Sequence, residues 1–151
     1  MTQAVYIHEF AVACALGADA DIVQRNLLSP APLTVHGRME LVDGRSVPAG
    51  VLPFELADAS SDSRCNLLAD HLLASLAPAI AREKDSVGPR RVAVVVGTST
   101  SGVREAGTAF VSFLELGHWP KNFRASAQEL GDTVAHVARK IGAQGRLDIN
   151  C

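Results

Sequence analysis

The chain has 151 residues, of which 48% are hydrophobic, so it can bury a core of its own, and this composition excludes an intrinsically disordered protein. Its formal net charge is −2, with 14 basic and 16 acidic residues mixed along the sequence, which argues against binding to nucleic acid or to an anionic membrane. The longest apolar runs, near residues 10–18 and 92–97, are much shorter than the roughly 20 residues of a membrane-spanning helix.

The beginning of the sequence is not typical of a secretory signal, because no positive charge precedes its apolar stretch, and His8 and Glu9 interrupt that stretch. Three cysteines, Cys14, Cys65 and Cys151, are too far apart in sequence to form a zinc-ligand pair. The five histidines are dispersed, and none forms the i, i+4 pair of a zinc hydrolase. We therefore expect a cytoplasmic protein with reduced thiols, no metal site and no cofactor.

The first elements are those of an α/β protein. In residues 4–17, apolar and polar side chains first alternate loosely, and an apolar run then extends to Gly17. This pattern predicts a central strand. Asp19 or Asp21 is placed to cap a short helix that extends to about Leu28. A strand followed by a helix is the usual opening of an α/β sheet.

A hairpin and a long helix are expected next. Residues 33–52 alternate between apolar and polar side chains around the turn signal Asp43-Gly44, which predicts a peripheral β-hairpin. A polar cluster then precedes a stripe of leucines at every fourth position over residues 68–80, which predicts a helix with a core-facing side. Pro78 is expected to kink this helix or to end it early.

Residues 92–96 are apolar on both faces, which predicts a central strand covered by helices on both sides. The strand ends in a loop rich in hydroxyl groups, which invites comparison with a phosphate-binding loop. Gly97 and Gly102 have the spacing of that loop, but Val103 and Arg104 occupy the positions of its lysine and its magnesium-binding hydroxyl. The comparison therefore fails.

A serine nucleophile is the next hypothesis for this loop. Ser99 has Gly97 two residues before it, but Ser101 replaces the second glycine of a hydrolase nucleophile elbow. No His and Asp stand at recognisable positions to activate a hydroxyl, so we expect no labelling by a fluorophosphonate.

Asp132 and His136 are four residues apart on one predicted helix face, a spacing more typical of a surface pair than of a catalytic dyad.

The last third of the chain begins with a less regular region that contains several aromatic residues. Ser126 and Glu129 then have the spacing of a capping box, which predicts a helix that ends at Gly142. The final residues, 146–151, are typical of the first half of another strand.

In this order, the segments resemble the N-terminal part of a β-ketoacyl-acyl carrier protein synthase, a condensing enzyme of the thiolase superfamily. The segments that carry the resemblance are "FAVACALG", "DADIVQRNLL", "AGVL", "DSRCNLLADHLL", "RRVAVVVGTSTSGV" and "ASAQELGDTVAHVARKIGAQG". The resemblance implies an α/β chain with a partial thiolase-like fold. Residues 1–151 would form the N-terminal half-domain, the first βα half, with a mixed sheet covered by helices.

The resemblance also implies a function. Members of the family extend acyl chains in fatty-acid or polyketide-type pathways by decarboxylative Claisen condensation. An acyl group on a cysteine thiolate is attacked by the carbanion of malonyl-carrier protein, while two histidines, or a histidine and an asparagine, stabilise the oxyanion and a lysine lies nearby. The implied partners are acyl carrier protein and a second subunit, in a homodimer or in a heterodimer with a synthase subunit.

Substrate-binding residues follow from the same resemblance, because in related synthases this loop lies beside the acyl channel and the dimer interface. Ser101, Gly102 and Val103 are therefore candidate pocket residues, with Phe123 and Ala125 contributed by the opposite subunit. A purely structural loop is the alternative. No catalytic residue is predicted.

The chain departs from the family after Gly145. The family continues with Pro, a short strand and Thr-Ala-Cys-Ser, whose cysteine begins a buried helix, whereas this chain reads Arg-Leu-Asp-Ile-Asn-Cys and ends. Cys151 can be interpreted as the nucleophile, since "DIN" precedes the active-site cysteine in one branch of the family, usually with two further residues between. The other interpretation is an altered tail, because no helix N-terminus or histidine would activate a terminal thiol.

We therefore expect a chain truncated before the nucleophile helix and inactive by itself in condensation. The alternative is a non-catalytic partner or interaction module, similar to the chain-length-factor subunits that pair with an active synthase. An incomplete fold would leave apolar surface or a sheet edge exposed, so we also expect self-association or poor solubility.

Overall fold

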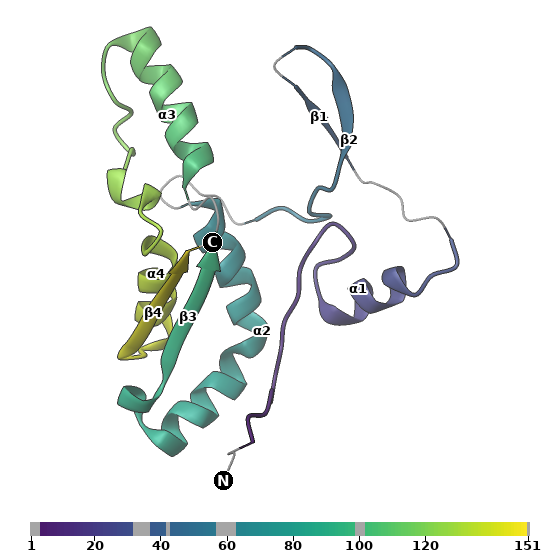
Figure 1. Cartoon of the computed structure of the whole chain (residues 1–151), viewed down its shortest axis with the longest axis vertical. Coiled ribbons are helices and arrows are strands. Elements are labelled where there is room, and N and C mark those ends of the chain that lie inside the picture. Colours follow the sequence, from purple (N-terminus) through teal and green to yellow (C-terminus); the bar gives the residue numbers. More distant parts are fainter. Residues whose placement is uncertain (1–3, 32–36, 42, 57–62, 99–101, 151) are drawn as a thin grey trace. The chain divides into compact units, whose positions relative to one another are not determined.

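The computed structural model describes residues 4–31, 37–41, 43–56, 63–98 and 102–150 (Figure 1). The chain divides into two compact units, Met1–Glu55 and Leu56–Cys151. Within the described ranges, no helix is both long enough and apolar enough to cross a membrane.

In the first unit, the predicted helix and hairpin are both present. The helix α1 is Ala20–Leu27, and the carboxylate of Asp19 accepts a hydrogen bond of 2.9 Å from a backbone amide of its first turn, as expected of an N-cap. The strands β1, Gly37–Glu40, and β2, Ser46–Ala49, pair antiparallel. Between them Gly44 has a φ of 80°, which explains why the turn contains glycine.

The N-terminal segment differs from the prediction. Residues 4–13 form no strand, and a single antiparallel bridge joins Cys14 to Gly17, so the expected central strand over residues 4–17 is wrong. Val5 and Ile7 are 94% and 87% exposed. The alternating sequence is suited to a strand, but a strand also needs a neighbour to complete its hydrogen bonds, and the first unit offers this segment none among its described residues.

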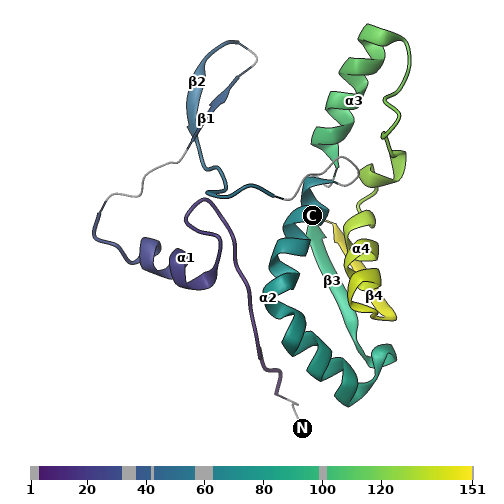
Figure 2. The same cartoon turned by 180° about the vertical axis from the view of Figure 1, so that it is seen from behind.

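The second unit contains a two-stranded parallel sheet covered on one face by two helices. The strands β3, Ala93–Thr98, and β4, Gly145–Asn150, pair in register along their whole length. The helices α2, Arg64–Val87, and α4, Asp132–Ile141, lie together against one face of this sheet (Figure 2). A short 3-10 turn, Pro89–Arg91, connects α2 to β3.

The core of the second unit lies between the sheet and these helices. Its most buried residue is Val134, which is 2% exposed. The core consists of Val94, Val134, Val137 and Ala138, with Ala69, Leu73, Val96, Ile141 and Ala143 packed against it. The leucine stripe of residues 68–80 is only half-buried, because α2 turns the neighbouring face, with Ala69 and Leu73, toward the sheet.

Three boundaries in the second unit differ from the predictions. Residues Val103–Leu116 form the helix α3, where a less regular region was expected. Pro78 lies on the exposed side of α2 and does not end this helix. Proline cannot donate a backbone hydrogen bond, but packing of α2 on α4 holds the helix together on both sides of the missing bond. The predicted capping box is absent, since Ser126 belongs to a 3-10 turn, Ala125–Gln128, and α4 begins only at Asp132. Gly142 ends α4 in the left-handed conformation, as predicted.

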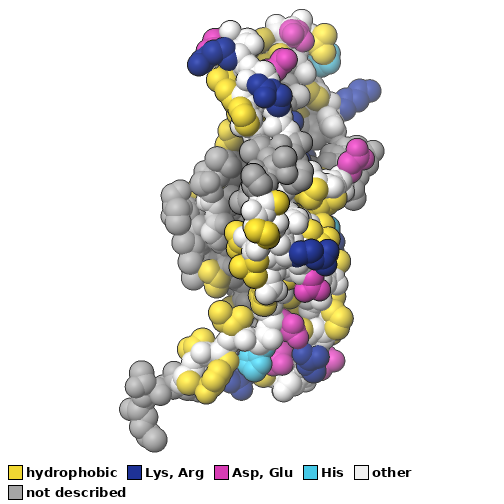
Figure 3. Space-filling model, turned by 90° about the vertical axis from the view of Figure 1, so that its right-hand side faces the viewer, with side chains coloured by type: hydrophobic (Ala, Val, Ile, Leu, Met, Phe, Trp, Pro, Cys, Tyr) yellow, Lys and Arg dark blue, Asp and Glu magenta, His cyan; other side chains and the backbone are white. Residues whose placement is uncertain are grey.

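Apolar surface is exposed in both units. Val95 points away from the core of the second unit and is 57% exposed, so among the described residues the sheet is covered on one face and not on both, as had been expected. In Figure 3, exposed hydrophobic side chains lie among basic and acidic ones over the face in view. The expectation that apolar surface would be left exposed is confirmed.

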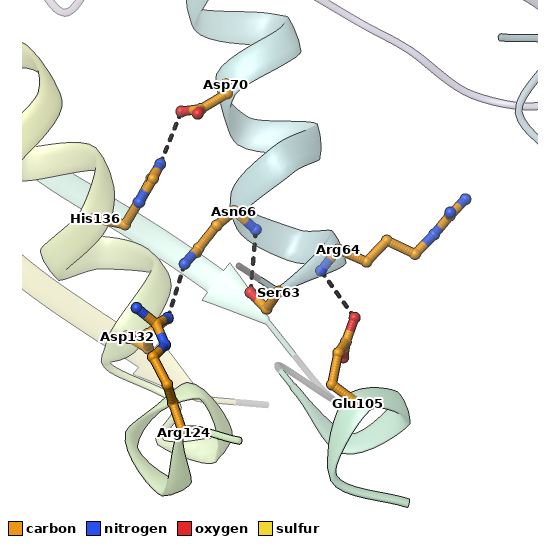
Figure 4. Close-up of polar contacts among 8 residues, drawn as sticks. All are labelled: Ser63, Arg64, Asn66, Asp70, Glu105, Arg124, Asp132 and His136. Atoms are coloured by element: carbon orange, nitrogen blue, oxygen red, sulfur yellow. Dashed lines mark hydrogen bonds and ion pairs between the residues drawn. The ribbon is translucent and has the colours of Figure 1, made fainter. Parts of the chain in front are cut away.

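Polar contacts join α2 to α4 beside this core (Figure 4). Nε2 of His136 and Nζ of Lys140 donate hydrogen bonds of 2.8 and 2.6 Å to the carboxylate of Asp70. Asp132 accepts a hydrogen bond of 2.8 Å from Nδ2 of Asn66. The predicted pairing of Asp132 with His136 is therefore wrong, because each of these side chains reaches across to α2.

The Asp70 cluster predicts a dependence of stability on pH. Burial raises the pKa of Asp70, but the hydrogen bonds from Lys140 and His136 lower it by more, so the pKa lies below its ordinary value. A carboxyl with a depressed pKa stabilises the fold above its unfolded pKa of about 3.9, and this contribution disappears as the pH falls through its folded pKa. Asp70→Asn should lower the free energy of unfolding by about 1 kcal/mol at pH 7.

Urea denaturation at pH 7 and pH 3 measures this effect. The difference in unfolding free energy between the wild type and Asp70→Asn should shrink at pH 3. Asp85→Asn, on the exposed side of the same helix, should have no effect at either pH. Equal losses for both variants would contradict the role assigned to Asp70.

Candidate functional site

A pocket of about 410 Å3 lies in the second unit, where α3 faces the segment that follows it. One wall comes from the beginning and middle of α3, and the other from residues 120–128. The lining residues are Ser63, Gly102, Arg104, Glu105, Ala106, Thr108, Ala109, Ser112, Pro120, Asn122, Phe123, Arg124, Ala127 and Gln128. This size falls within the range of about 300 to 1,000 Å3 usual for small-molecule sites.

The base of the pocket depends on a close backbone contact. The amide of Gly102 donates a hydrogen bond of 3.1 Å to the carbonyl oxygen of Ala127. A Cβ atom at position 102 would overlap that same carbonyl oxygen. The backbone of Gly102 has a φ of −77°, so the reason for glycine here is space and not conformation. Gly102 therefore brings the two walls together.

Aromatic stacking fixes the second wall. Trp119, the single tryptophan of the chain, stacks on Phe123 with ring centroids 4.5 Å apart and on Phe113 with centroids 4.8 Å apart. Phe123 lines the pocket, and Phe113 belongs to α3. The indole is thus held between the two walls, and its fluorescence should respond to a ligand that displaces Phe123.

Hydrogen bonds tie the start of α2 to the same site (Figure 4). Ser63 is 1% exposed, and its hydroxyl caps α2 by accepting a hydrogen bond of 3.3 Å from the amide of Asn66. The amide of Arg64 donates to Oε1 of Glu105 at 2.9 Å. Arg124 lies 3.8 Å from the carboxylate of Asp132 and also lines the pocket. The pocket lining therefore carries charges of both signs, whereas the alanines and Phe123 of the same lining are apolar.

Cys65 is the described thiol nearest in sequence to the pocket residue Ser63. Desolvation by burial raises the pKa of the Cys65 thiol, and the negative charge of Glu105 raises it further. A nucleophilic cysteine requires the opposite shift, toward the thiolate. Among the described residues there is also no group of three or more His, Cys, Asp or Glu side chains that could hold a metal ion.

The structure brings only part of the predicted site together. Gly102 and Phe123 of the same chain both line the pocket, whereas a contribution of Phe123 from the opposite subunit stays a prediction. Val103 is 60% exposed, and neither it nor Ala125 is among the lining residues. Ser101 lies outside the described residues, as do Ser99, Thr100 and Cys151, so the hypotheses for these four residues stay predictions.

Sequence reasoning missed most of the first wall. Ala106 and Ala109 line the pocket from one side of α3, and Ala109 is 7% exposed. Their spacing is that of one helix face, and Gly117, with a φ of 75°, ends α3 as a C-cap glycine. These signals were available in the sequence, but the helix they indicate was not predicted.

Comparison with known proteins supports the fold. No protein-family model matches the chain, and no curated protein matches it. Among solved structures, the chain is similar to a ketosynthase (ApeO) in complex with its chain length factor (ApeC) from Xenorhabdus doucetiae, with a TM-score of 0.74 and 27% sequence identity. The match covers 93% of this chain and 39% of that chain. The protein therefore has an α/β, partial thiolase-like fold of the ketosynthase type.

Proposed function

We propose that the chain supplies an acyl-binding pocket to a ketosynthase-type unit for fatty-acid or polyketide-type chain elongation, and that by itself it does not catalyse condensation. The observation that carries this proposal is the pocket of about 410 Å3 lined by Gly102 and Phe123. The pocket lies along α3, which Gly102 precedes, in a fold similar to a ketosynthase with its chain length factor.

The lining suits an acyl thioester. Ala106, Ala109, Phe123 and Ala127 offer apolar contacts for a hydrocarbon chain. Hydroxyl, amide and guanidinium groups elsewhere in the lining offer hydrogen bonds to the polar end of such a ligand. Acyl carrier protein is the proposed donor of the acyl group.

The same lining lacks the groups that condensation requires. Among the described residues, those that line the pocket include no His, Cys or Lys. Formation of an acyl-enzyme needs an activated nucleophile, and in the family that the chain resembles this nucleophile is a cysteine thiolate. We therefore expect no ketoacyl product when the chain alone is incubated with acyl- and malonyl-carrier protein and the products are analysed by mass spectrometry. Turnover above a no-protein control would refute this part of the proposal.

Binding is tested separately by the fluorescence of Trp119. Titration with a medium-chain acyl-pantetheine thioester should change the emission saturably, because the ligand contacts Phe123, on which the indole stacks. Ala106→Leu fills part of the pocket and should raise the dissociation constant about tenfold, which corresponds to about 1.4 kcal/mol. Ala125→Leu adds the same side chain at an exposed position outside the lining and is the matched control. Equal affinities for both variants, or no saturable change in the wild type, would contradict the proposed pocket.

A second candidate function is a chain-length-factor-like partner of an active synthase. It is favoured because the similar structure is a ketosynthase in complex with its chain length factor. Co-expression with an intact ketosynthase should then yield a complex of fixed stoichiometry on size-exclusion chromatography. Elution of the two proteins as separate species would remove this candidate.

A further inference from the structure

A second pocket, of about 340 Å3, lies between α2 and the end of α4. Its lining comes from one side of α2 over residues 70–84 and from residues 140 and 141 of α4. We call this pocket the α2–α4 groove. Residues 70 and 84 are 14 positions apart, which is a rise of about 21 Å along a helix, so the groove is elongated along α2. None of the described residues lines both this groove and the pocket beside α3, so the two sites are separate.

The walls of the groove are aliphatic. Ala74, Ala77 and Ala81 recur at intervals of three and four residues, so they share one side of α2, and their small side chains leave room beside it. The other apolar lining residues have branched aliphatic side chains; they are Leu73, Ile80 and Ile141. The described lining contains no aromatic ring, hydroxyl group or amide side chain. Such walls suit a flexible hydrocarbon chain and not a flat ring or a sugar.

Lys84 places a positive charge at one end of the groove. Its half-buried side chain donates a hydrogen bond of 2.8 Å from Nζ to the carbonyl oxygen of Ile141, the last residue of α4. This bond satisfies a terminal carbonyl of the helix and holds the ammonium group in the groove. Among the described residues, no carboxylate forms an ion pair with Lys84. An ammonium group has three N–H donors, so two remain for a ligand.

At the other end of the groove, the positive charge is already matched. Nζ of Lys140 lies 2.6 Å from the carboxylate of Asp70, which also accepts a hydrogen bond from His136. The unmatched charge of the groove is therefore that of Lys84. A ligand with one negative group and a hydrocarbon tail fits this arrangement, with the negative group at Lys84 and the tail along the alanines.

We propose that the α2–α4 groove binds a medium-chain fatty acid as its free carboxylate, with the carboxylate on Lys84 and the hydrocarbon chain along Ala81, Ala77 and Ala74. A hydrogen bond between an ammonium group and a carboxylate is stronger than one between neutral groups. An acyl thioester has no negative charge at its carbonyl group, so Lys84 selects the free acid over the thioester. The proposal does not depend on the acyl-binding function of the pocket beside α3, because the two sites have different residues and take different ligands.

Titration of the full chain with octanoate, followed by methyl NMR spectroscopy, locates the site. The methyl signals of Ile80 and Ile141 should shift saturably, because both side chains line the groove. The methyl signal of Ile22, in α1, should not shift and is the internal control. Absence of a saturable shift at Ile80 and Ile141 would overturn the proposal.

The role of the charge is tested with octanol, which has the same tail and no negative group. Octanol should bind the wild type about tenfold more weakly than octanoate. Lys84→Met should raise the dissociation constant of octanoate about tenfold and leave that of octanol unchanged, because it removes only the charged group. Lys121→Met is the matched control, since Lys121 is exposed and lines neither pocket. Equal binding of octanoate and octanol by the wild type, or equal effects of the two methionine variants, would contradict the assignment of Lys84.

A pair of leucine variants tests the path of the hydrocarbon chain. Ala77→Leu fills the groove at an exposed position and should weaken octanoate binding about tenfold, because the new side chain displaces part of the hydrocarbon. Ala106→Leu fills the pocket beside α3 and should leave octanoate binding unchanged. Circular dichroism establishes that each variant is folded. Octanoate binding that survives Ala77→Leu, or that is lost in Ala106→Leu, would overturn the groove as the binding site.

Discussion

Replacing Gly102 with alanine should destabilise the second unit by about 3 kcal/mol, the upper part of the range for overpacking at a site that cannot relax. The new methyl group would overlap the carbonyl oxygen of Ala127, and this contact is between two backbones, so no side chain can rotate away. The hydrogen bond between the amide of residue 102 and this carbonyl would be lost as well. Loss of this contact would separate the two walls of the pocket.

Gly107→Ala is the matched control on the same helix. It meets no atom within 4 Å and removes a helix-interior glycine, so it should stabilise the chain by up to about 1 kcal/mol. Urea denaturation followed by circular dichroism measures both variants, and near-ultraviolet signals from Trp119 report the pocket wall. If Gly102→Ala were as stable as the wild type, the close contact with Ala127 would not be part of the fold.

The parts of the fold that the sequence predicted have local causes. Asp19 caps α1, Gly44 makes the hairpin turn and Gly142 ends α4, and each acts on residues within a few positions of itself. The apolar run of β3 is also a local pattern, although burial of both its faces is not. The joint order of such signals is what suggested the ketosynthase type of fold, which the structural comparison supports.

The errors have a common physical origin in contacts between distant residues. The pairs His136–Asp70 and Asn66–Asp132 each join residues 66 positions apart, so no periodicity could reveal them. The pocket depends on contacts of this kind as well, because the bond from Gly102 to Ala127 brings the segment that contains Phe123 beside the start of α3. Val103 is 60% exposed in α3, and its role as a pocket residue, which the family resemblance implies, stays a prediction.

The contact between Asn66 and Asp132 supports the second large effect. Asn66 is 1% exposed, and its amide group donates to a carboxylate that is itself only 15% exposed. Asn66→Asp preserves size but replaces this donor with a second carboxylate at hydrogen-bonding distance. The cost at pH 7 should be about 3 kcal/mol, because the new charge is buried and its neighbour has the same sign. Arg124, at 3.8 Å from Asp132, is too distant and too exposed to offset both charges.

This loss should depend on pH, which distinguishes it from a packing defect. Burial and the neighbouring carboxylate raise the pKa of the introduced pair in the folded state, so the variant loses stability as the pH rises above the unfolded pKa of about 4. Urea denaturation should therefore show a smaller loss of unfolding free energy at pH 5 than at pH 7, because at pH 5 the two carboxyl groups share one proton. The double variant Asn66→Asp/Asp132→Asn exchanges the amide and the carboxylate and should recover most of the stability at pH 7. If the loss were independent of pH and the exchange gave no recovery, the hydrogen bond between α2 and α4 would not hold these helices together.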